Sequence, residues 1–409
     1  MKSKLRGAAA LLAVSAVIFT GCSSSKSKDT TAAETVAATE GAPADTAAAT
    51  EAAATEAAAA TEAAATEAAA TEAAATKAAA APAGGKVGVS LILKTLSNPF
   101  FVSMQKDAQA NADKLGVNLT VAAGKDDGDT ATQIAAIEAA VAKGDKGILI
   151  TPSADDVVPA LDAARKAGLL VIALDTPPNP ATAVDITFAT DNYLAGQLIG
   201  KWANGQLGGK KAVIAMLDLF NDKVVSVDTH RDQGFLNGMG IIAKEDPSGN
   251  AKEPATGKYT GGDYAVVCHE PTNGAVDGGK TAMETCLTKN GNVNVVYTIN
   301  EPAAQGAYDA LKAAGKEKGV LIVSVDGGCK PGLELVASGV IGATAQQYPG
   351  QMASKGMQAI VDLAGGKPKP AVSPGLDFFN TGVALVTDKA VTGVESISVA
   401  DGQKICWGG

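Results

Sequence analysis

The chain has 409 residues and a formal net charge of −9, and aromatic residues make up 4% of it. An acidic chain without a basic cluster in its body argues against nucleic acid as a partner, and this length is more than one hydrophobic core usually serves. With two histidines and no Gly-x-Ser-x-Gly motif a hydrolase is poorly supported, so we expect no enzymatic activity, no cofactor and no metal site.

The first 22 residues have the layout of a signal peptide. Lys2, Lys4 and Arg6 precede an apolar run over 7–19, which is too short to span a bilayer, and Cys22 follows. The segment resembles a bacterial lipobox, although Phe19 stands where Leu, Val or Ile is usual. We therefore expect lipidation of Cys22, which would anchor the protein to the outer face of the cell membrane. An ordinary cleaved signal is the alternative, and both place the chain outside the cytoplasm.

Residues 23–85 are predicted to be a tether. The unit Thr-Glu-Ala-Ala-Ala repeats from residue 50 onward, and the segment contains almost no large apolar residue from which to build a core. Alanine-rich segments with interspersed charges act as semi-rigid spacers. We expect this one to hold a globular body, residues 86–409, away from the membrane.

Apolar periodicity in the body predicts alternating strands and helices. Ser153 and Asp156 read as the cap of one helix. The predicted strands are 87–93, 117–123, 147–150, 169–174, 212–217, 264–268, 293–298, 320–325 and 341–345, and the clearest later helices are 192–205, 229–243, 277–289, 302–314 and 349–364. This alternation predicts an α/β fold with open parallel sheets, and the number of strands calls for two lobes.

Polar and aromatic side chains gather where these strands end. In open parallel sheets ligands bind beyond the carboxyl ends of the strands. The residues at those ends and at the start of a second-lobe helix are Asn98, Phe100, Phe101, Asp175, Arg231, Asn300, Asp326 and Gln347. Carboxylates and amides can bridge adjacent sugar hydroxyls, and a phenyl face can cover a sugar ring. The alternative is that the Asp and Asn residues only cap helices.

Six segments resemble the ribose-binding-protein family, periplasmic binding protein type 1, which comprises the extracytoplasmic sugar-binding proteins of ABC transporters. They begin at Lys94, Val171, Ala189, His230, Ser324 and Ala345, and read KTLSNPFFVSM, VIALD, ATDN, HRDQGF, SVDG and AQQYP. The resemblance covers about residues 86–385. It implies ligand contacts at the eight positions above, a monosaccharide ligand, an ABC permease as partner and a monomer.

Two departures from the family bear on the sugar. Thr176 stands where ribose binders have Arg, and neither Asn273 nor Gly274 supplies the second-lobe aromatic. The segments TINEPAA from Thr298, LDFFN from Leu376 and DGGC from Asp326 are similar to the fructose-type branch in actinobacteria. The resemblance thus favours fructose, with ribose, xylose or a related ligand as alternatives.

The family fold further implies discontinuous lobes joined by a three-strand hinge. The first lobe would comprise 86–188 plus 348–381 and the second 189–347 plus 382–409. Both lobes would then contribute to the site, and hinge closure would bring the two halves together.

Four cysteines remain after Cys22, and an even number in an exported chain suggests two disulfides with three possible connectivities. We predict Cys268–Cys286, because a strand and the helix after it pack together, and hence Cys329–Cys406. Strand and helix geometry does not by itself bring the first pair within bonding range.

Two other functions remain open at this point. Residues 274–281 match the P-loop pattern of NTPases, including Lys280 and Thr281. A glycine-rich helix N-terminus would account for the same residues, and an exported protein would not meet the cytosolic nucleotide that an NTPase needs. A sugar-sensing receptor is the other alternative.

Overall fold

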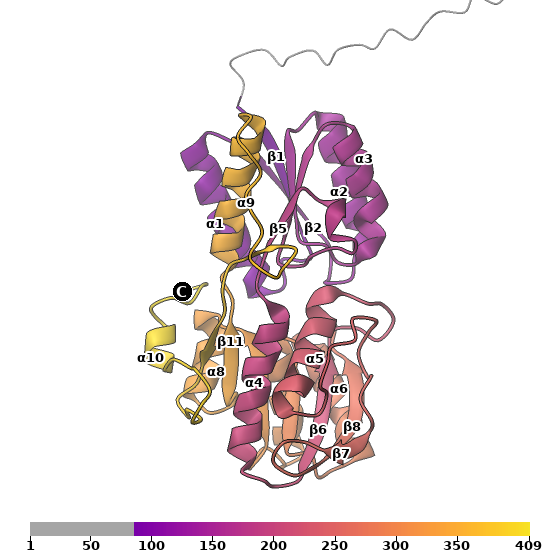
Figure 1. Cartoon of the computed structure of the whole chain (residues 1–409), viewed down its shortest axis with the longest axis vertical. Coiled ribbons are helices and arrows are strands. Elements are labelled where there is room, and N and C mark those ends of the chain that lie inside the picture. Colours follow the sequence, from indigo (N-terminus) through magenta and orange to yellow (C-terminus); the bar gives the residue numbers. More distant parts are fainter. Residues whose placement is uncertain (1–85) are drawn as a thin grey trace, which may run out of the picture. The chain divides into compact units, whose positions relative to one another are not determined.

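The computed structural model describes residues 86–409. The predicted signal peptide with Cys22 and the predicted tether fall outside the described residues. Between residues 86 and 409, no helix is both long enough and apolar enough to cross a membrane. The strands form two separate sheets, one in each of two lobes, which confirms the predicted α/β fold (Figure 1).

The sheet of the first lobe is entirely parallel, in the order β12-β5-β4-β3-β1-β2. Its strands are β1 (Gly88–Leu93), β2 (Asn118–Ala123), β3 (Gly147–Ile150), β4 (Leu170–Leu174), β5 (Ile186–Ala189) and β12 (Phe379–Asn380). Helices α1 (Pro99–Leu115) and α9 (Pro349–Ala364) cover one face, and α2 (Thr130–Lys143) and α3 (Val158–Lys166) cover the other (Figure 1).

The sheet of the second lobe has the order β13-β11-β10-β9-β6-β8-β7. Its strands are β6 (Ala212–Asp218), β7 (Thr256–Lys258), β8 (Asp263–Pro271), β9 (Val295–Thr298), β10 (Leu321–Asp326), β11 (Ala343–Gln346) and β13 (Ala384–Val386). The edge strands β7 and β13 run antiparallel to their neighbours, whereas the sequence predicts a fully parallel sheet. Both edge strands are three residues long, too short to show a periodicity.

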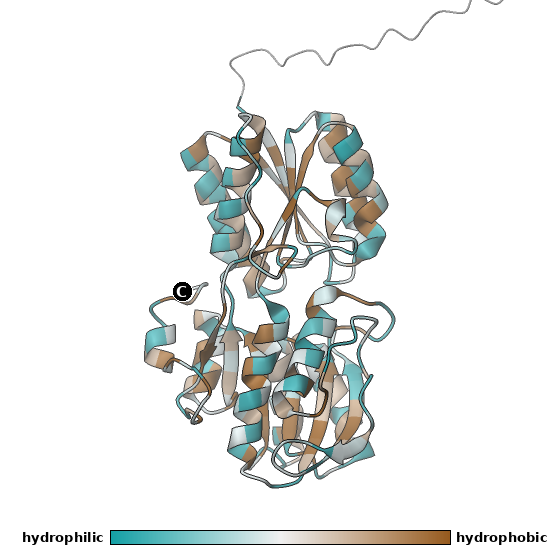
Figure 2. Cartoon of the chain, viewed as in Figure 1, coloured by the Kyte–Doolittle hydropathy of each residue, from teal (hydrophilic) through white to brown (hydrophobic). Residues whose placement is uncertain are grey.

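Helices cover both faces of this second sheet as well. Its helices are α4 (Asn192–Leu207), α5 (Ser226–Met239), α6 (Val276–Lys289), α7 (Glu301–Ala313) and α8 (Glu334–Ala337), and the short α10 (Val399–Gly402) lies in the C-terminal tail. Apolar residues gather on the strands and on the helix faces that meet them, while the outer helix faces are polar (Figure 2). Burial of these faces on both sides of each sheet is the main stabilising contribution.

The chain passes between the sheets three times. It leaves the first sheet after β5, returns after β11, and crosses again between β12 and β13. We propose on this basis the discontinuous lobes 86–188 plus 348–381 and 189–347 plus 382–409.

Local sequence explains how α1 begins and ends. Asn98 accepts a hydrogen bond from the Phe100 backbone N–H, Pro99 occupies the first turn, and Gly116 ends the helix with a φ of 70°. The cap predicted at Ser153 is wrong. Its backbone N–H donates to Gln133 Oε1, a turn over Asp155–Val157 follows, and α3 begins only at Val158, without a side-chain cap.

Helices α4 and α5 approach each other unusually closely. A Cβ at Gly200 would lie 2.3 Å from the carbonyl oxygen of Phe235, and one at Gly234 would lie 2.2 Å from that of Tyr193. Only glycine allows two backbones to meet at this distance. The close packing fixes α5, which carries Arg231, against the start of α4.

The structure contains the disulfides Cys268–Cys286 and Cys329–Cys406, which are the expected pairs. The first joins β8 to α6, and the second holds the C-terminal tail to the turn after β10. That tail ends beside the junction of the two lobes (Figure 1). There Trp407 donates from Nε1 to the backbone oxygen of Asp326 at 3.0 Å.

Candidate functional site

One small cavity between the lobes is lined by all eight residues singled out from the sequence. They are Asn98, Phe100, Phe101 and Asp175 of the first lobe, Arg231, Asn300 and Asp326 of the second, and Gln347 at a crossing. The cavity holds about 20 Å³, close to what one water needs. A larger groove of about 1090 Å³ lies between α1, α9 and the C-terminal tail. The buried charges converge on the small cavity, so we place the candidate site there.

Asp175 and Asp326 both have unusual backbones. Asp175 follows β4 with a φ of 66°, and Asp326 ends β10 with a φ of 137°. Backbone strain of this kind in non-glycine residues persists where the surrounding structure enforces it, and it concentrates at functional sites. Here it turns one carboxylate from each lobe toward the same cavity.

The first-lobe carboxylate is held by two neighbours. The Thr176 hydroxyl donates to Asp175 Oδ2 at 2.8 Å, and Lys94 Nζ lies 3.8 Å from the same oxygen. Thr176 therefore orients the aspartate by a hydrogen bond and leaves out the charge that an arginine at this position would bring. Asp175 Oδ1 has no hydrogen-bond partner within residues 86–409.

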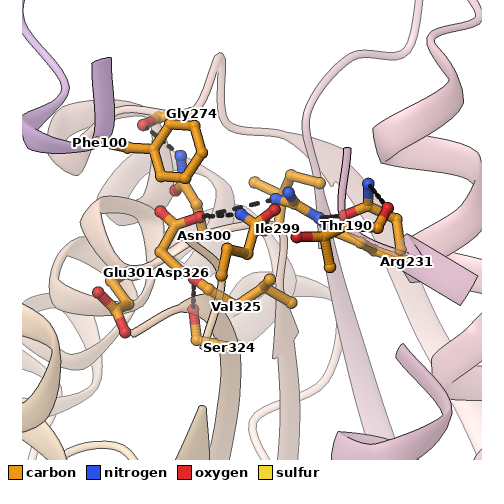
Figure 3. Close-up of polar contacts among 12 residues, drawn as sticks. Phe100, Thr190, Arg231, Gly274, Ile299, Asn300, Glu301, Ser324, Val325 and Asp326 are labelled. Atoms are coloured by element: carbon orange, nitrogen blue, oxygen red, sulfur yellow. Dashed lines mark hydrogen bonds and ion pairs between the residues drawn. The ribbon is translucent and has the colours of Figure 1, made fainter. Parts of the chain in front are cut away.

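The second-lobe groups form a connected polar network, part of which is drawn in Figure 3. Arg231 donates from Nε to Asn192 Oδ1 at 2.7 Å and from Nη1 to the Ile299 carbonyl at 2.9 Å. Its Nη1 also lies 3.9 Å from Asp326 Oδ1, which accepts a hydrogen bond of 2.9 Å from Gln347 Nε2. These contacts fix the guanidinium in place and leave some of its N–H donors free for a ligand.

Asn98 and Asn300 serve the fold and line the cavity at the same time. Asn98 caps α1, and Asn300 caps α7 by accepting from the Ala303 backbone N–H at 3.0 Å. Asn300 also donates from Nδ2 to the Gly274 carbonyl at 2.9 Å. The helix-cap interpretation therefore holds for both residues, and each amide keeps at least one N–H for another acceptor.

Aromatic rings close the first-lobe side of the cavity. Phe100 and Phe101 meet edge to face with centroids 5.3 Å apart. In Figure 3 the Phe100 ring lies above Asp326 and Asn300, so an apolar face from one lobe opposes polar groups from the other. A sugar ring presents one apolar C–H face and a rim of hydroxyls, which suits this arrangement.

Glu301 supports the loop that carries Asp326. It is 1% exposed and accepts hydrogen bonds from the backbone N–H groups of Gly327 and Gly328, at 2.7 and 3.2 Å. The Thr344 hydroxyl donates to it at 2.8 Å. Glu301 is not among the eight predicted ligand residues, because its function in the loop depends on contacts distant in sequence.

Burial raises the pKa of two carboxylic acids that line the cavity. The pKa of Asp326 rises to about 7, chiefly because burial disfavours its charge, although Arg231 opposes the rise. The pKa of Asp127 rises to about 6 for the same main reason, opposed by Lys94. A ligand that donates hydrogen bonds to these carboxylates would favour their ionised forms.

Three buried acceptors at this cavity have no hydrogen-bond partner in the described part of the chain. They are Asp127 Oδ1, Asp175 Oδ1 and Gln347 Oε1. Buried polar atoms in native proteins are normally paired. These three therefore mark places where a bound molecule with several hydroxyl groups could donate.

Five further residues line the cavity and are not among the predicted ligand contacts: Lys94, Asp127, Leu219, Val227 and Ile299. Lys94 and Asp127 come shortly after β1 and β2, so the strand-end rule could have found them. Leu219, Val227 and Ile299 are apolar and come from the second lobe. Gly274 is near enough that a Cβ there would lie 2.5 Å from Asp127 Oδ2.

The P-loop pattern is part of a helix. Helix α6 starts at Val276, so Gly279, Lys280 and Thr281 are helical, and Lys280 is exposed. A Cβ at Gly279 would lie 2.2 Å from the Ala303 carbonyl oxygen. The glycine thus permits close packing of α6 on α7, and the segment forms no phosphate-binding loop. The nucleotide interpretation loses its structural basis.

Comparison with known proteins adds family information. Residues 87–368 match the family described as periplasmic binding protein domain. The ribose import binding protein of Salmonella typhimurium is 31% identical over 72% of this chain and 90% of that protein. The D-allose-binding periplasmic protein of Escherichia coli is 26% identical over 67% of this chain and 83% of its own length.

Solved structures show the same fold. A solute-binding protein from Actinobacillus succinogenes with bound D-allose has a TM-score of 0.61 and 24% identity, covering 74% of this chain and 98% of that chain. One from Agrobacterium vitis with bound D-fucose has a TM-score of 0.64 and 24% identity, covering 78% and 99%.

Proposed function

The chain belongs to the periplasmic binding protein family, whose members here include the ribose import binding proteins, and on that premise we propose that it captures a monosaccharide between its lobes for an ABC importer. The observation that carries the proposal is a set of three acceptors in one cavity that have no hydrogen-bond partner within residues 86–409: Asp127 Oδ1, Asp175 Oδ1 and Gln347 Oε1. Hydroxyl groups of a sugar would donate to them and accept from Arg231 and Lys94.

Fructose is the ligand that we favour. Thr176 stands where ribose binders have arginine, and neither Asn273 nor Gly274 supplies the second-lobe aromatic. Leu219, Val227 and Ile299 are apolar residues of that lobe that line the cavity. Related proteins carry names for ribose and allose, so a pentose or another hexose is the competing outcome of the test below.

Capture would proceed by closure of the lobes. The cavity of about 20 Å³ cannot admit a monosaccharide unless the lobes separate. Because each lobe supplies one aspartate and several other contacts, only the closed form makes the complete set, and a ligand shifts the population toward it. The three crossings between the sheets would serve as the hinge.

We also propose that Cys22 is lipidated and that the protein works as a monomer on the outer face of the cell membrane. The sequence of residues 1–22 supports the lipidation, and the family resemblance supports the monomer. Mass spectrometry of the N-terminal peptide from membranes tests this; a mature chain with an unmodified Cys22 contradicts it.

A thermal-unfolding screen of the mature chain tests the main proposal. Fructose, ribose, xylose, allose and several polyols are added singly. A ligand that binds only the folded state stabilises it by about 2.7 kcal/mol at a hundredfold excess over its Kd, so we expect a clear rise of Tm with fructose. Arg231→Ala is the matched control and should remove the rise. A well-folded protein that responds to no sugar refutes the proposal.

A further inference from the structure

A second group of titratable side chains lies in the second lobe, and none of its members lines the sugar cavity. Asp218 ends β6, Asp232 lies on α5, His269 lies on β8, and Glu253 lies on the segment between α5 and β7. Figure 1 shows α5, β6 and β8 together in this lobe. Elements distant in sequence therefore bring three carboxylates around one imidazole.

The imidazole of His269 is the centre of this group. Its Nδ1 lies 2.8 Å from Asp218 Oδ2 and 3.7 Å from Asp232 Oδ2, and its Nε2 lies 2.8 Å from Glu253 Oε1. Within residues 86–409, all ion pairs of these three carboxylates are with His269. Negative charge thus exceeds positive charge in this group, in which the three carboxylate side chains are buried and that of His269 is 19% exposed.

The burial of the Asp232 carboxylate is not accounted for by His269 alone. It is 0% exposed, and neither of its carboxylate oxygens has a hydrogen-bond partner in the described chain. A doubly protonated His269 would donate to one oxygen of Asp218 and one of Glu253, and would leave both buried oxygens of Asp232 without a hydrogen bond, with only the 3.7 Å ion pair to Nδ1. Native structures rarely leave a fully buried carboxylate without a partner.

We propose that Asp218, Asp232 and His269 bind a divalent transition-metal ion of the Zn²⁺ class. One ligand atom from each lies within 4.8 Å of the others. Bonds of about 2.0 Å in tetrahedral geometry separate zinc ligands by about 3.3 Å, between the 2.8 and 3.7 Å seen here. One imidazole nitrogen with two carboxylates suits zinc better than Ca²⁺ or Mg²⁺, which prefer oxygen ligands alone.

Glu253 fits a supporting position in this site. A metal-binding histidine commonly donates its second ring N–H to a carboxylate, which fixes the orientation of the ring. With Nδ1 on the ion, Nε2–H of His269 would donate to Glu253. A surface pocket of about 360 Å³ reaches Asp218 and His269, and through it the ion and a water ligand can enter.

This inference departs from the expectation of no metal site. The three ligands are far apart in sequence and come from three elements, so no short spacing could reveal them. The ion would join β6, α5 and β8. Because Arg231 precedes Asp232 on α5, the ion would stabilise the helix that carries a sugar contact without itself touching the sugar.

The test uses the mature chain after treatment with EDTA and removal of the chelator. Calorimetric titration with ZnCl₂ should give one ion per chain, and Zn²⁺ should raise the Tm. Glu253→Gln should weaken Zn²⁺ binding by about 10–100-fold, and Asp232→Asn should weaken it further. Glu284→Gln makes the same charge change on the exposed face of α6 and should leave Zn²⁺ affinity unchanged.

Several outcomes would overturn the metal site. They are less than one equivalent of bound Zn²⁺, unchanged affinity in Asp232→Asn, and preference for Ca²⁺ or Mg²⁺. If Asp232→Asn fails to fold, His269→Gln replaces it and should lose the ion equally. Sugar response is measured in the same samples with and without Zn²⁺, so the two proposals can fail separately.

Discussion

The ring of Phe100 meets the indole of Trp407 edge to face, with centroids 5.5 Å apart and planes at 87°. Phe100 belongs to the first lobe, whereas the C-terminal tail that carries Trp407 is held to the second lobe by Cys329–Cys406. The indole also donates to the Asp326 carbonyl. One residue of the tail therefore contacts an aromatic wall of the cavity and the loop of its second-lobe aspartate.

Replacement of Trp407 by alanine should lower both stability and sugar affinity. Loss of a buried tryptophan typically costs about 3–5 kcal/mol, and Phe100 would lose a packing partner. Trp407→Phe keeps a ring but removes the N–H donor, so its effect should be smaller. Chemical unfolding and sugar titration measure the two effects. Wild-type affinity in Trp407→Ala would show that the tail does not support the site.

The charged groups of the cavity should be individually necessary for binding. Asp175→Ala, Arg231→Ala and Asp326→Ala each leave sugar hydroxyls or an opposite charge unpaired, at about 1–3 kcal/mol or more apiece. We expect loss of the sugar-induced Tm rise with retained circular dichroism. Lys280→Ala, on the exposed face of α6, is the control and should bind normally. If all three variants bind as the wild type does, the site is misplaced.

Sugar affinity should fall as the pH falls below about 7. Burial raises the pKa of Asp326 to about 7, with Arg231 opposing the rise and Asp175 adding to it, and raises that of Asp127 to about 6. Protonation removes a charged acceptor, so affinity should drop by at most about tenfold per pH unit for each proton taken up. Calorimetry in a series of buffers measures this, and a constant affinity contradicts it.

The stability of the ligand-free protein should fall as the pH rises, whereas its sugar affinity should rise. An acid whose folded pKa is raised holds a proton that the unfolded chain has lost, so between the ordinary value of 3.8 and about 7 the contribution of Asp326 to stability declines as pH rises. Unfolding free energies measured across this range provide the check.

Glu301 should be required for the Asp326 loop rather than for direct contact with sugar. Glu301→Ala leaves two backbone N–H groups and the Thr344 hydroxyl without their acceptor, at about 1–3 kcal/mol each. Glu301→Gln keeps the shape and one acceptor oxygen, and should cost less. Denaturant unfolding ranks the two variants, and equal stability of the two would contradict this function of Glu301.

Close packing of α4 and α5 should be needed to place Arg231. Gly234→Ala inserts a Cβ 2.2 Å from the Tyr193 carbonyl oxygen, and overpacking of this kind costs about 1–3 kcal/mol. We expect lower stability and weaker sugar binding. Gly291→Ala is the matched control, since its nearest neighbour is the mobile end of Lys316 at 3.1 Å. A Gly234→Ala variant with wild-type stability and wild-type sugar affinity would contradict the prediction.

Much of this architecture could be predicted because strands buried on both faces are rich in apolar residues and the helices between them have a regular apolar face. The β4 segment is a continuous apolar run, and β10 is apolar except for Ser324 and the terminal Asp326. The alternation of such strands with helices gives the α/β class, and the number of strands gives the two lobes. Family membership, predicted from six motifs, is confirmed. The short strands β5, β7, β12 and β13 are not among the predicted strands, because two to four residues show no periodicity and only tertiary pairing defines them.

The candidate site was predictable where ligand groups follow strands and not where contacts are long-range. Asp175 and Asp326 come directly at strand ends, so position alone indicated them. Glu301 and His269 gain their surroundings from residues on other elements, which sequence order does not reveal. The choice of fructose stays a prediction, because a single hydroxyl position distinguishes many sugars.

The disulfide between Cys329 and Cys406 encloses a covalent loop whose ends are 77 positions apart. That loop contains α9 and β12, which belong to the other lobe. Most of the segment between them, over 365–377, is exposed and lacks regular structure, so it is the natural place for a protease to cut. A single cut there would leave the two fragments bonded to each other, and they would separate on a gel only after reduction.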